Sequence, residues 1–169
     1  MFTVGILVAS DQGAAGKRID ESGPVAAAYL KELGGEVIKI VVVEDERQKI
    51  AHAIQLLCDE DNLDLVITSG GTGFSQRDVT PEATSEVIER SIPGFSEIIR
   101  MTSYRSNPRA ILSRAVSGIR GRTIVINLPG SPNGVREALE IIGPSLVHGI
   151  EILKGTASEC GGHTNTPCL

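Results

Sequence analysis

The sequence predicts an α/β fold, a three-layer, doubly wound and mostly parallel sheet flanked by helices. Short apolar runs rich in β-branched residues alternate with helical patterns, three strand–helix pairs being followed by an irregular stretch and a fourth pair. Nearly continuous apolar runs are typical of strands buried on both faces of a parallel sheet. The 169 residues fit one domain, which we place at 1–156, with a flexible C-terminal tail at 157–169.

Periodicity places the elements along the chain. The predicted helices contain apolar stripes over 26–33, 50–58 and 135–153, and the first should stop at Gly34-Gly35. Gly143-Pro144 should break or kink the last helix, because proline lacks the N–H that a helix interior needs. The predicted strands are Phe2–Ala9, Val37–Val43, Leu63–Thr68 and Thr123–Leu128.

Composition excludes several classes of protein. Aromatic residues make up 3% of the chain, so the core must be aliphatic and a site of stacked rings is not expected. A net charge of -5 argues against binding to nucleic acid or anionic membrane, because both need concentrated positive charge. No apolar run approaches the ~20 residues of a membrane span. Three cysteines without C-x-x-C spacing are expected to be reduced thiols, and we expect a cytoplasmic protein.

The loops that follow the strands are the expected ligand-binding segments, because ligands of such sheets lie beyond the carboxyl ends of the strands. The loop after the third strand carries the strongest signal, Ser69-Gly70-Gly71-Thr72-Gly73. Its glycines permit positive φ and bring N–H groups against phosphate oxygens. A plain tight turn is the alternative, and phosphate binding is favoured. Thr80 is expected to cap, and Pro81 to start, a helix whose N-terminus adds to the anion site.

Two acidic positions stand beside this loop. Asp78 either complements the dipole of the following helix or serves as a carboxylate near phosphates bridged by Mg²⁺. Asp45 closes the second strand between Glu44 and Glu46. Local residues favour a simple helix N-terminal cluster there, with a metal ligand or proton acceptor as the alternative.

Three further segments have two interpretations each. Ser10-Asp11 after the first strand is a turn or a polar wall of the pocket. Pro129-Gly130-Ser131 is a rigid turn or a contact for a nucleotide or substrate. Six arginines between 100 and 122 form a local basic zone, from which one or two side chains could hold an anionic substrate.

Five segments also share a resemblance. They are GGTGFSQRDVTPEAT (70–84), Asp45-Glu46, PGF (93–95), AILSR (110–114) and NLPGSP (127–132). Together they closely resemble the molybdopterin adenylyltransferases of molybdenum-cofactor biosynthesis, the family that includes the G domain of gephyrin. The resemblance extends from Phe2 to Lys154.

The resemblance implies a G-domain-type fold, a homotrimer, and Mg²⁺-dependent transfer of AMP from ATP to the terminal phosphate of molybdopterin, releasing pyrophosphate. Molybdopterin and ATP are the implied partners, and other proteins of the pathway stay open. Asp45 and Asp78 match the family's two essential aspartates and are expected to be catalytic and to hold the metal. The matching binding positions are Ser10, Asp11, Ser69, Gly70, Gly71, Thr72, Gly73, Asn127, Pro129, Gly130 and Ser131.

Two departures from the family pattern stand near these aspartates. Glu44 replaces the proline that commonly precedes the Asp-Glu pair, and Gln76 replaces a basic residue. A non-catalytic pterin carrier of the same fold is therefore the alternative function, and a scaffold trimer is a third. In the leading interpretation the carboxylates orient groups and hold metal, because the attacking phosphate is already anionic and needs no general base.

Overall fold

Four adjacent parallel strands form most of a six-stranded sheet. β1 (Phe2–Ala9) pairs with β2 (Gly35–Val43) on one side and with β3 (Leu65–Ser69) on the other, and β3 pairs with β6 (Thr123–Leu128). The strand order is β2-β1-β3-β6-β5-β4. The chain first moves from β1 to one neighbour and then returns to the other side of β1. The strand order therefore reverses between β1 and β3, where ligands of such sheets bind.

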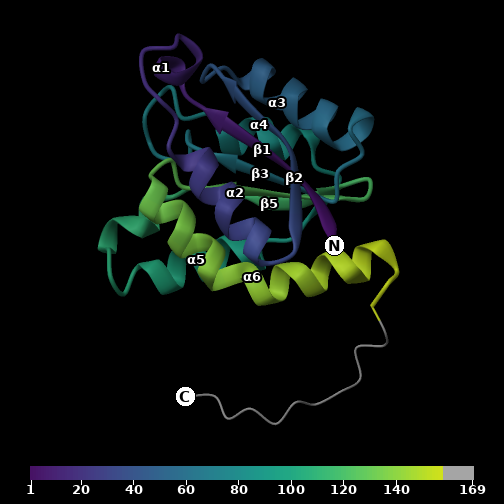
Figure 1. Cartoon of the computed structure of the whole chain (residues 1–169). Coiled ribbons are helices and arrows are strands. Elements are labelled where there is room, and N and C mark those ends of the chain that lie inside the picture. The colour runs from purple at the N-terminus through teal and green to yellow at the C-terminus, as the bar shows by residue number, and fades with distance from the viewer. Residues whose placement is uncertain (158–169) are drawn as a thin grey trace.

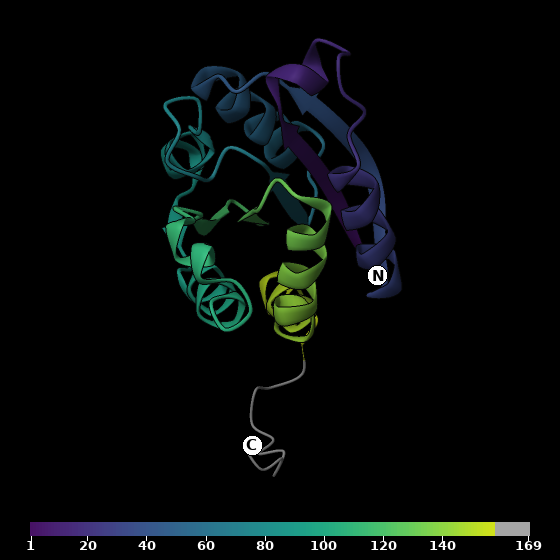
Figure 2. The same ribbon diagram turned by 90° about the vertical axis from the view of Figure 1, so that its left-hand side faces the viewer.

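Helices cover both faces of this sheet, as the doubly wound prediction requires (Figure 1). α2 (Ser22–Glu32), α5 (Gly94–Ser103) and α6 (Pro132–Lys154) lie on one face. α3 (Arg47–Gln55) and α4 (Thr80–Val87) lie on the other, and Figure 2 shows the sheet edge-on between the two groups. A short helix, α1 (Asp11–Ala14), follows β1, and a π-helical turn (Leu56–Glu60) extends α3. The three-layer fold class is confirmed.

The irregular stretch contains two short strands that periodicity did not predict. β4 (Arg90–Ser91) and β5 (Ser117–Arg120) add to β6 in antiparallel fashion, and a 3₁₀ turn (Pro108–Leu112) lies between them. Two and four residues are too few for an alternating pattern to emerge from the sequence. Two of the four predicted strands have the expected bounds, whereas β2 starts at Gly35 and β3 spans Leu65–Ser69.

Two aliphatic clusters, one on each face of the sheet, form the core. Ile6, Ile67 and Ile126 point to the side of α2 and α6, where Leu30 and Leu139 pack on them. The cluster on the other side contains Leu7, Val66 and Val125 from the strands, with Ile50, Ile54, Ala83 and Val87 from α3 and α4. Adjacent strand residues thus serve opposite clusters, which explains the nearly continuous apolar runs of β1, β3 and β6.

The sequence predicts a break or a kink at Gly143-Pro144, and of these the break is wrong. α6 runs from Pro132 to Lys154 with Pro144 inside it. Proline removes the hydrogen bond to the carbonyl four residues earlier, that of Glu140, an exposed residue of the helix. Gly143 leaves room for α2, because a Cβ there would lie 3.1 Å from Leu33 Cδ1.

The structure, a computed structural model, describes residues 1–157. Residues 158–169, most of the predicted tail, and with them Cys160 and Cys168, lie outside the described residues. Cys58 is a buried thiol, and burial raises its pKa to about 11, so this thiol is unreactive at neutral pH. Within residues 1–157, no helix is both long enough and apolar enough to span a membrane.

Candidate active site

The loops after β1, β3 and β6 meet at one edge of the sheet with almost no space between their backbones. A Cβ on Gly70 would lie 2.5 Å from the carbonyl oxygen of Ala9, and one on Gly130 would lie 3.1 Å from Gly70 Cα. Gly70 also has a φ of +97°, which only glycine adopts at low cost. Ser69 Oγ donates to the Pro129 carbonyl at 2.9 Å, joining two of the loops. Glycine at 70 is therefore required by geometry as well as by backbone conformation.

Two cavities open at this edge and share Ser131 in their walls. The first has a volume of about 400 Å³ and lies where the strand order reverses. The second, of about 260 Å³, lies on the other side of Ser131. The first is lined by residues that include Ser10, Arg18, Asp20, Ser69, Gly70 and Gly130, and the second by Thr72, Gly73, Asn107, Arg109, Pro129 and Glu137.

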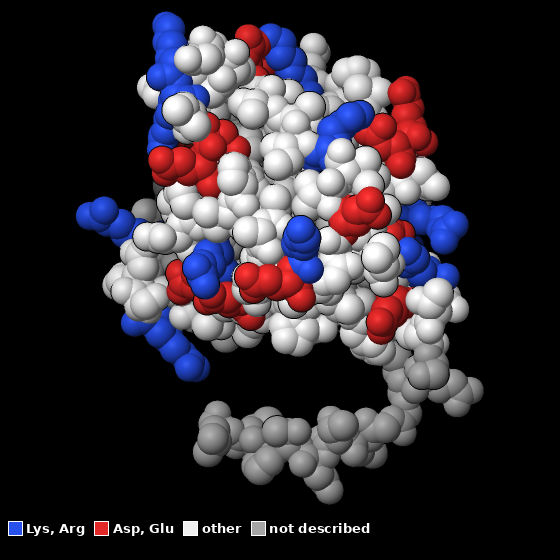
Figure 3. Space-filling model, in the orientation of Figure 1, with Lys and Arg blue, Asp and Glu red and all other residues white. Residues whose placement is uncertain are grey.

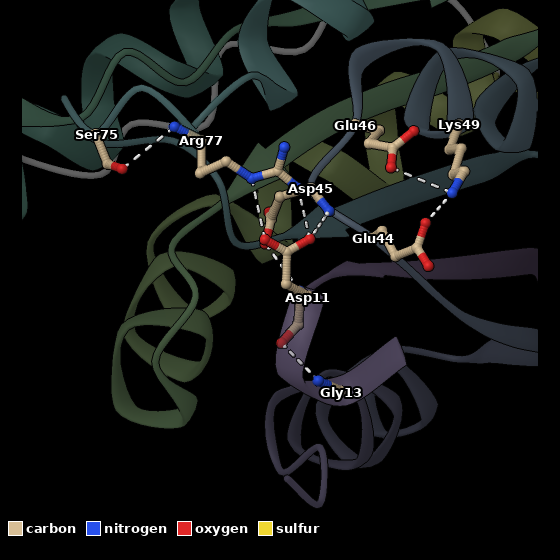
Figure 4. Close-up of polar contacts among 9 residues, drawn as sticks. Asp11, Gly13, Glu44, Asp45, Glu46, Lys49, Ser75 and Arg77 are labelled. Atoms are coloured by element: carbon tan, nitrogen blue, oxygen red, sulfur yellow. Dashed lines mark hydrogen bonds and ion pairs between the residues drawn. The ribbon is translucent and has the colours of Figure 1, made fainter. Parts of the chain in front are cut away.

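Asp11 and Asp45 are joined by two hydrogen bonds, each from the backbone N–H of one residue to the carboxylate of the other. The Asp11 N–H donates to Asp45 Oδ2 at 2.9 Å, and the Asp45 N–H donates to Asp11 Oδ1 at 3.0 Å. Arg77 completes this arrangement, because its Nε and Nη2 donate to the two oxygens of Asp11 at 3.0 and 2.7 Å (Figure 4). These hydrogen bonds join the segments that follow β1, β2 and β3, and Arg77 and Asp11 are 66 residues apart in the sequence.

The two carboxylates have opposite electrostatic environments. The hydrogen bonds from Arg77 hold the pKa of Asp11 below its ordinary value of 3.8. Burial raises the pKa of Asp45 above the same value, and the negative charges of Asp11 and Asp78 act in the same direction. Asp45 is thus a carboxylate whose negative charge is poorly compensated, and a bound cation would relieve it.

Glu44, the departure from the family pattern, does not join this cluster. Lys49 forms ion pairs with both Glu44 and Glu46, all three side chains being about half exposed. Figure 4 shows this group on the far side of Asp45 from Asp11 and Arg77. Glu44 therefore adds no carboxylate to the cluster around Asp11 and Asp45.

Asp78 closes the exposed end of the glycine loop. Its Oδ2 accepts from the Ser75 N–H at 2.7 Å, and its own N–H donates to the Ser75 carbonyl at 3.0 Å. A Cβ on Gly73 would lie 3.0 Å from the same Oδ2. The carboxylate thus lies against the glycine loop rather than in open solvent.

Thr80 behaves differently from the sequence prediction, and the cap predicted there is wrong. It is the first residue of α4, its side chain caps nothing, and its Oγ1 is buried without a hydrogen-bond partner in the described structure. A Cβ on Gly71 would lie 2.4 Å from this Oγ1 and 3.3 Å from Asp45 Oδ1. An unsatisfied buried hydroxyl is rare and points to a water or ion at this position.

These oxygen atoms suit Mg²⁺. Within residues 1–157, no three His, Cys, Asp or Glu side chains lie together as a complete metal site. Mg²⁺ is usually held by one or two carboxylates, with water and substrate phosphates completing its shell. Asp45 and Asp78, with the Thr80 hydroxyl behind Gly71, provide such an incomplete set of hard oxygen donors, so the residues fit the ion.

Three of the predicted binding residues, Asn127, Ser131 and Ser10, form hydrogen bonds that stabilise the fold itself. Asn127 is fully buried, donates to Thr68 Oγ1 and Thr84 Oγ1 at 2.9 and 2.8 Å, and reaches neither cavity. Ser131 caps α6, because its Oγ accepts from the Gly134 N–H. Ser10 likewise caps α1 through Gly13. Both serines nevertheless line the first cavity, so capping and cavity lining coexist.

The basic zone divides into distinct roles. Arg100 donates to the carbonyls of Ser113 and Ala115, and Arg120 to Asp59 and the Val87 carbonyl. Arg114 contacts the glycine loop from behind. Arg109 lines the second cavity, which makes it the arginine of this zone placed for an anionic ligand. The contact of Arg77 with Asp11 escaped the sequence analysis, because no local pattern links residues so far apart.

The chain matches a known family over most of its length. The family described as "Probable molybdopterin binding domain" matches residues 5–148. A molybdopterin adenylyltransferase from Helicobacter pylori is 42% identical over 154 residues, covering 90% of this chain and 88% of the relative. Molybdenum cofactor biosynthesis protein B from Bacillus cereus is 40% identical over 132 residues, covering 76% and 78%.

A solved structure agrees with this relationship. The molybdopterin biosynthesis enzyme MoaB from Thermus thermophilus superposes with a TM-score of 0.87 at 44% identity, covering 92% of this chain and 98% of that one. Sequence and fold thus agree over the same residues that form the loops described above. The chain belongs to the molybdopterin-binding domain family and is a protein of molybdenum cofactor biosynthesis.

Proposed function

We propose that this protein is a molybdopterin adenylyltransferase that transfers AMP from ATP to the terminal phosphate of molybdopterin. One observation carries the proposal: Asp45 and Asp78 lie against Gly71 and Gly73 of a single glycine loop, and this loop contributes to the walls of both cavities, although neither carboxylate lines them. An enzyme that joins two anionic substrates needs two adjacent cavities and a means to offset negative charge between them. Relatives that carry the adenylyltransferase name support the same activity.

The two cavities suit the two substrates. The larger cavity lies at the reversal of strand order, where nucleotides commonly bind in such sheets, and the N-terminus of α6 faces it through Ser131 and Pro132. The smaller cavity contains Arg109, whose guanidinium is suited to a phosphate-bearing pterin. Ser131, common to both walls, marks the place where the terminal phosphate of the pterin meets the α-phosphorus of ATP.

In the proposed reaction an oxygen of the pterin phosphate attacks the α-phosphorus of ATP, and the bond to the departing pyrophosphate breaks. Backbone N–H groups of the glycine loop orient the phosphates, and Ser10, Ser69 and Ser131 supply hydroxyls in the cavity wall. Mg²⁺, when bound near Asp45 and Asp78, would offset the charge on the polyphosphate. Arg77 leaves Asp45 free to act there, because it pairs with Asp11 instead.

Pyrophosphate release tests the proposal. Purified protein with ATP, Mg²⁺ and molybdopterin should release pyrophosphate, and removal of the metal with EDTA should stop the release. Asp78→Asn should lower kcat by about 100-fold or more, because charge neutralisation at the phosphates is lost. Its fold should survive, since Asn keeps an acceptor for the Ser75 N–H.

Glu86→Gln is the matched control for this substitution. Glu86 is an exposed carboxylate on α4 that pairs with Arg47, away from both cavities, so its loss should leave kcat unchanged. Tight binding of molybdopterin without any turnover by the unmodified protein would instead assign the protein as a pterin carrier and refute the proposed reaction.

A further inference from the structure

The AILSR segment (110–114) resembles the family pattern but has no part in the reaction as proposed. Its last residue, Arg114, reaches back to the glycine loop. The Arg114 N–H donates to the Thr72 carbonyl at 2.9 Å, and its Nε donates to the Gly73 carbonyl at 2.7 Å. Its two terminal nitrogens donate to the Asp78 carbonyl and to the Glu82 carboxylate. One residue thus contacts both ends of the segment 73–78 and the first turn of α4.

Besides Arg114, polar contacts alone fix the segment between these ends: the Arg77 side chain pairs with Asp11, and the Arg77 N–H donates to Ser75 Oγ. Residues 74–77 are all exposed, and Phe74 is 69% exposed, so burial does not order them. Inside the segment, the Ser75 N–H donates to the Asp78 carboxylate, and the Asp78 N–H donates to the Ser75 carbonyl. The planar guanidinium fork donates to two backbone carbonyls five residues apart, a geometry that the point charge of a lysine cannot reproduce.

Arg114 itself is held in place from α5. Arg100 Nη1 donates to the Ala115 carbonyl at 2.9 Å and to the Ser113 carbonyl at 3.5 Å, on either side of Arg114. The Arg114 side chain is 34% exposed and lines neither cavity of the site. Its guanidinium nitrogens are occupied by the Gly73 and Asp78 carbonyls and by Glu82, so Arg114 acts on the site through the loop.

We propose that Arg114 is a positioning residue for adenylyl transfer, which fixes the segment 73–78 and thereby the carboxylate of Asp78. This inference rests on the proposed function for its catalytic consequence, while the ordering of the loop is independent of it. Gly70 and Gly71 have separate anchors, since the Gly70 N–H donates to the Leu128 carbonyl and the Thr80 N–H to the Gly71 carbonyl. Loss of the fork should therefore displace Asp78 more than the part of the loop nearest the first cavity.

Arg114→Lys tests this role, with Arg120→Lys as the matched control. Arg120 is also a partly buried arginine that donates to a carboxylate and to a backbone carbonyl, but of Asp59 and Val87, outside the site. In Arg114→Lys, kcat for pyrophosphate release should fall about 10-fold or more, with a smaller change in the KM for ATP. Arg120→Lys should leave both constants unchanged, even where it lowers Tm as much.

Amide hydrogen exchange gives a readout that needs no turnover. The amides of Ser75 and Asp78 should exchange faster in Arg114→Lys than in the unmodified protein or in Arg120→Lys. A kcat for Arg114→Lys within about 2-fold of the unmodified protein, or unchanged exchange at both amides, would overturn the proposal. An unmodified protein that shows no turnover would refute the adenylyltransferase assignment, and the exchange rates would still decide whether Arg114 orders the loop.

Discussion

Asp11 and Asp45 have opposite pKa shifts, although the backbone N–H of each donates to the carboxylate of the other. Asp11 gains the Arg77 guanidinium, and its pKa falls. Asp45 is more buried, faces the charges of Asp11 and Asp78, and its pKa rises. If both aspartates had only a structural role, each would be expected to have a compensating cation, as Asp11 has in Arg77. The uncompensated charge of Asp45 lowers the stability of the folded state, as is common for residues of functional sites.

This contrast predicts opposite effects of two amide substitutions on stability. A raised pKa means that ionised Asp45 destabilises the fold at neutral pH, so Asp45→Asn should raise Tm at pH 7. The gain should shrink as the pH falls through the pKa of Asp45, because the native carboxyl is then neutral as well. Asp45→Asn should nevertheless lose activity, since the proposed reaction uses this charge to hold Mg²⁺.

Asp11→Asn should behave in the opposite way. A lowered pKa means that ionised Asp11 stabilises the fold above pH 3.8, so the variant should have a lower Tm at pH 7. The difference should vanish once the pH falls below the lowered pKa of Asp11. Thermal unfolding between pH 3 and 8 checks both, and a lower Tm for Asp45→Asn at neutral pH would contradict the assigned environment.

At the scale of elements, the glycine loop depends on a contact that the sequence does not reveal. The pattern Ser69-Gly70-Gly71-Thr72-Gly73 after a buried strand predicted positive φ, and Gly70 and Gly71 have φ of +97° and +64°. No pattern of residues indicates that the Ala9 carbonyl lies against Gly70. The cap predicted at Thr80 failed for a related reason, because the start of α4 is fixed by the bond between the Thr80 N–H and the Gly71 carbonyl.

Gly70→Ala should therefore be strongly destabilising. Its Cβ would lie 2.5 Å from the Ala9 carbonyl oxygen, a backbone atom of a central strand that cannot move aside. Gly121→Ala is the matched control, because Gly121 also has a positive φ, +53°, but a Cβ there meets nothing within 4 Å. Urea unfolding should show a loss of about 1 kcal/mol for Gly121→Ala and at least ~2 kcal/mol more for Gly70→Ala. Equal losses would mean that backbone conformation alone requires glycine at 70.

Over the whole molecule, the basic residues do not gather into an extended positive surface on the face drawn in Figure 3. On the face drawn in Figure 3, acidic and basic side chains are interspersed. Three arginines of the basic zone, Arg100, Arg114 and Arg120, donate hydrogen bonds to carbonyls or carboxylates within the fold.

Exposed apolar side chains gather on α5 and the 3₁₀ turn, where Ile98, Met101 and Ile111 line a groove of about 630 Å³.

We expect this apolar groove to contribute to a homotrimer. Sedimentation equilibrium should give a mass about three times the 17.8 kDa of one chain. Met101→Glu, at a side chain that is 69% exposed, should shift the mass toward the monomer, because a charge would be buried between subunits. Ile152→Glu, at an exposed apolar position on α6, should leave the mass unchanged. A monomer in the unmodified protein would contradict the trimer.

The fold class, the bounds of β1 and β6 and the family could all be predicted from the sequence alone. These properties are local or periodic, so a short segment contains the information. Three contacts became visible only in the folded chain: Arg77 pairs with Asp11, Asn127 is buried away from both cavities, and Arg114 donates to the glycine loop. Such contacts join residues more than 40 positions apart, and their partners are selected by the packing of the whole sheet rather than by any neighbouring residue.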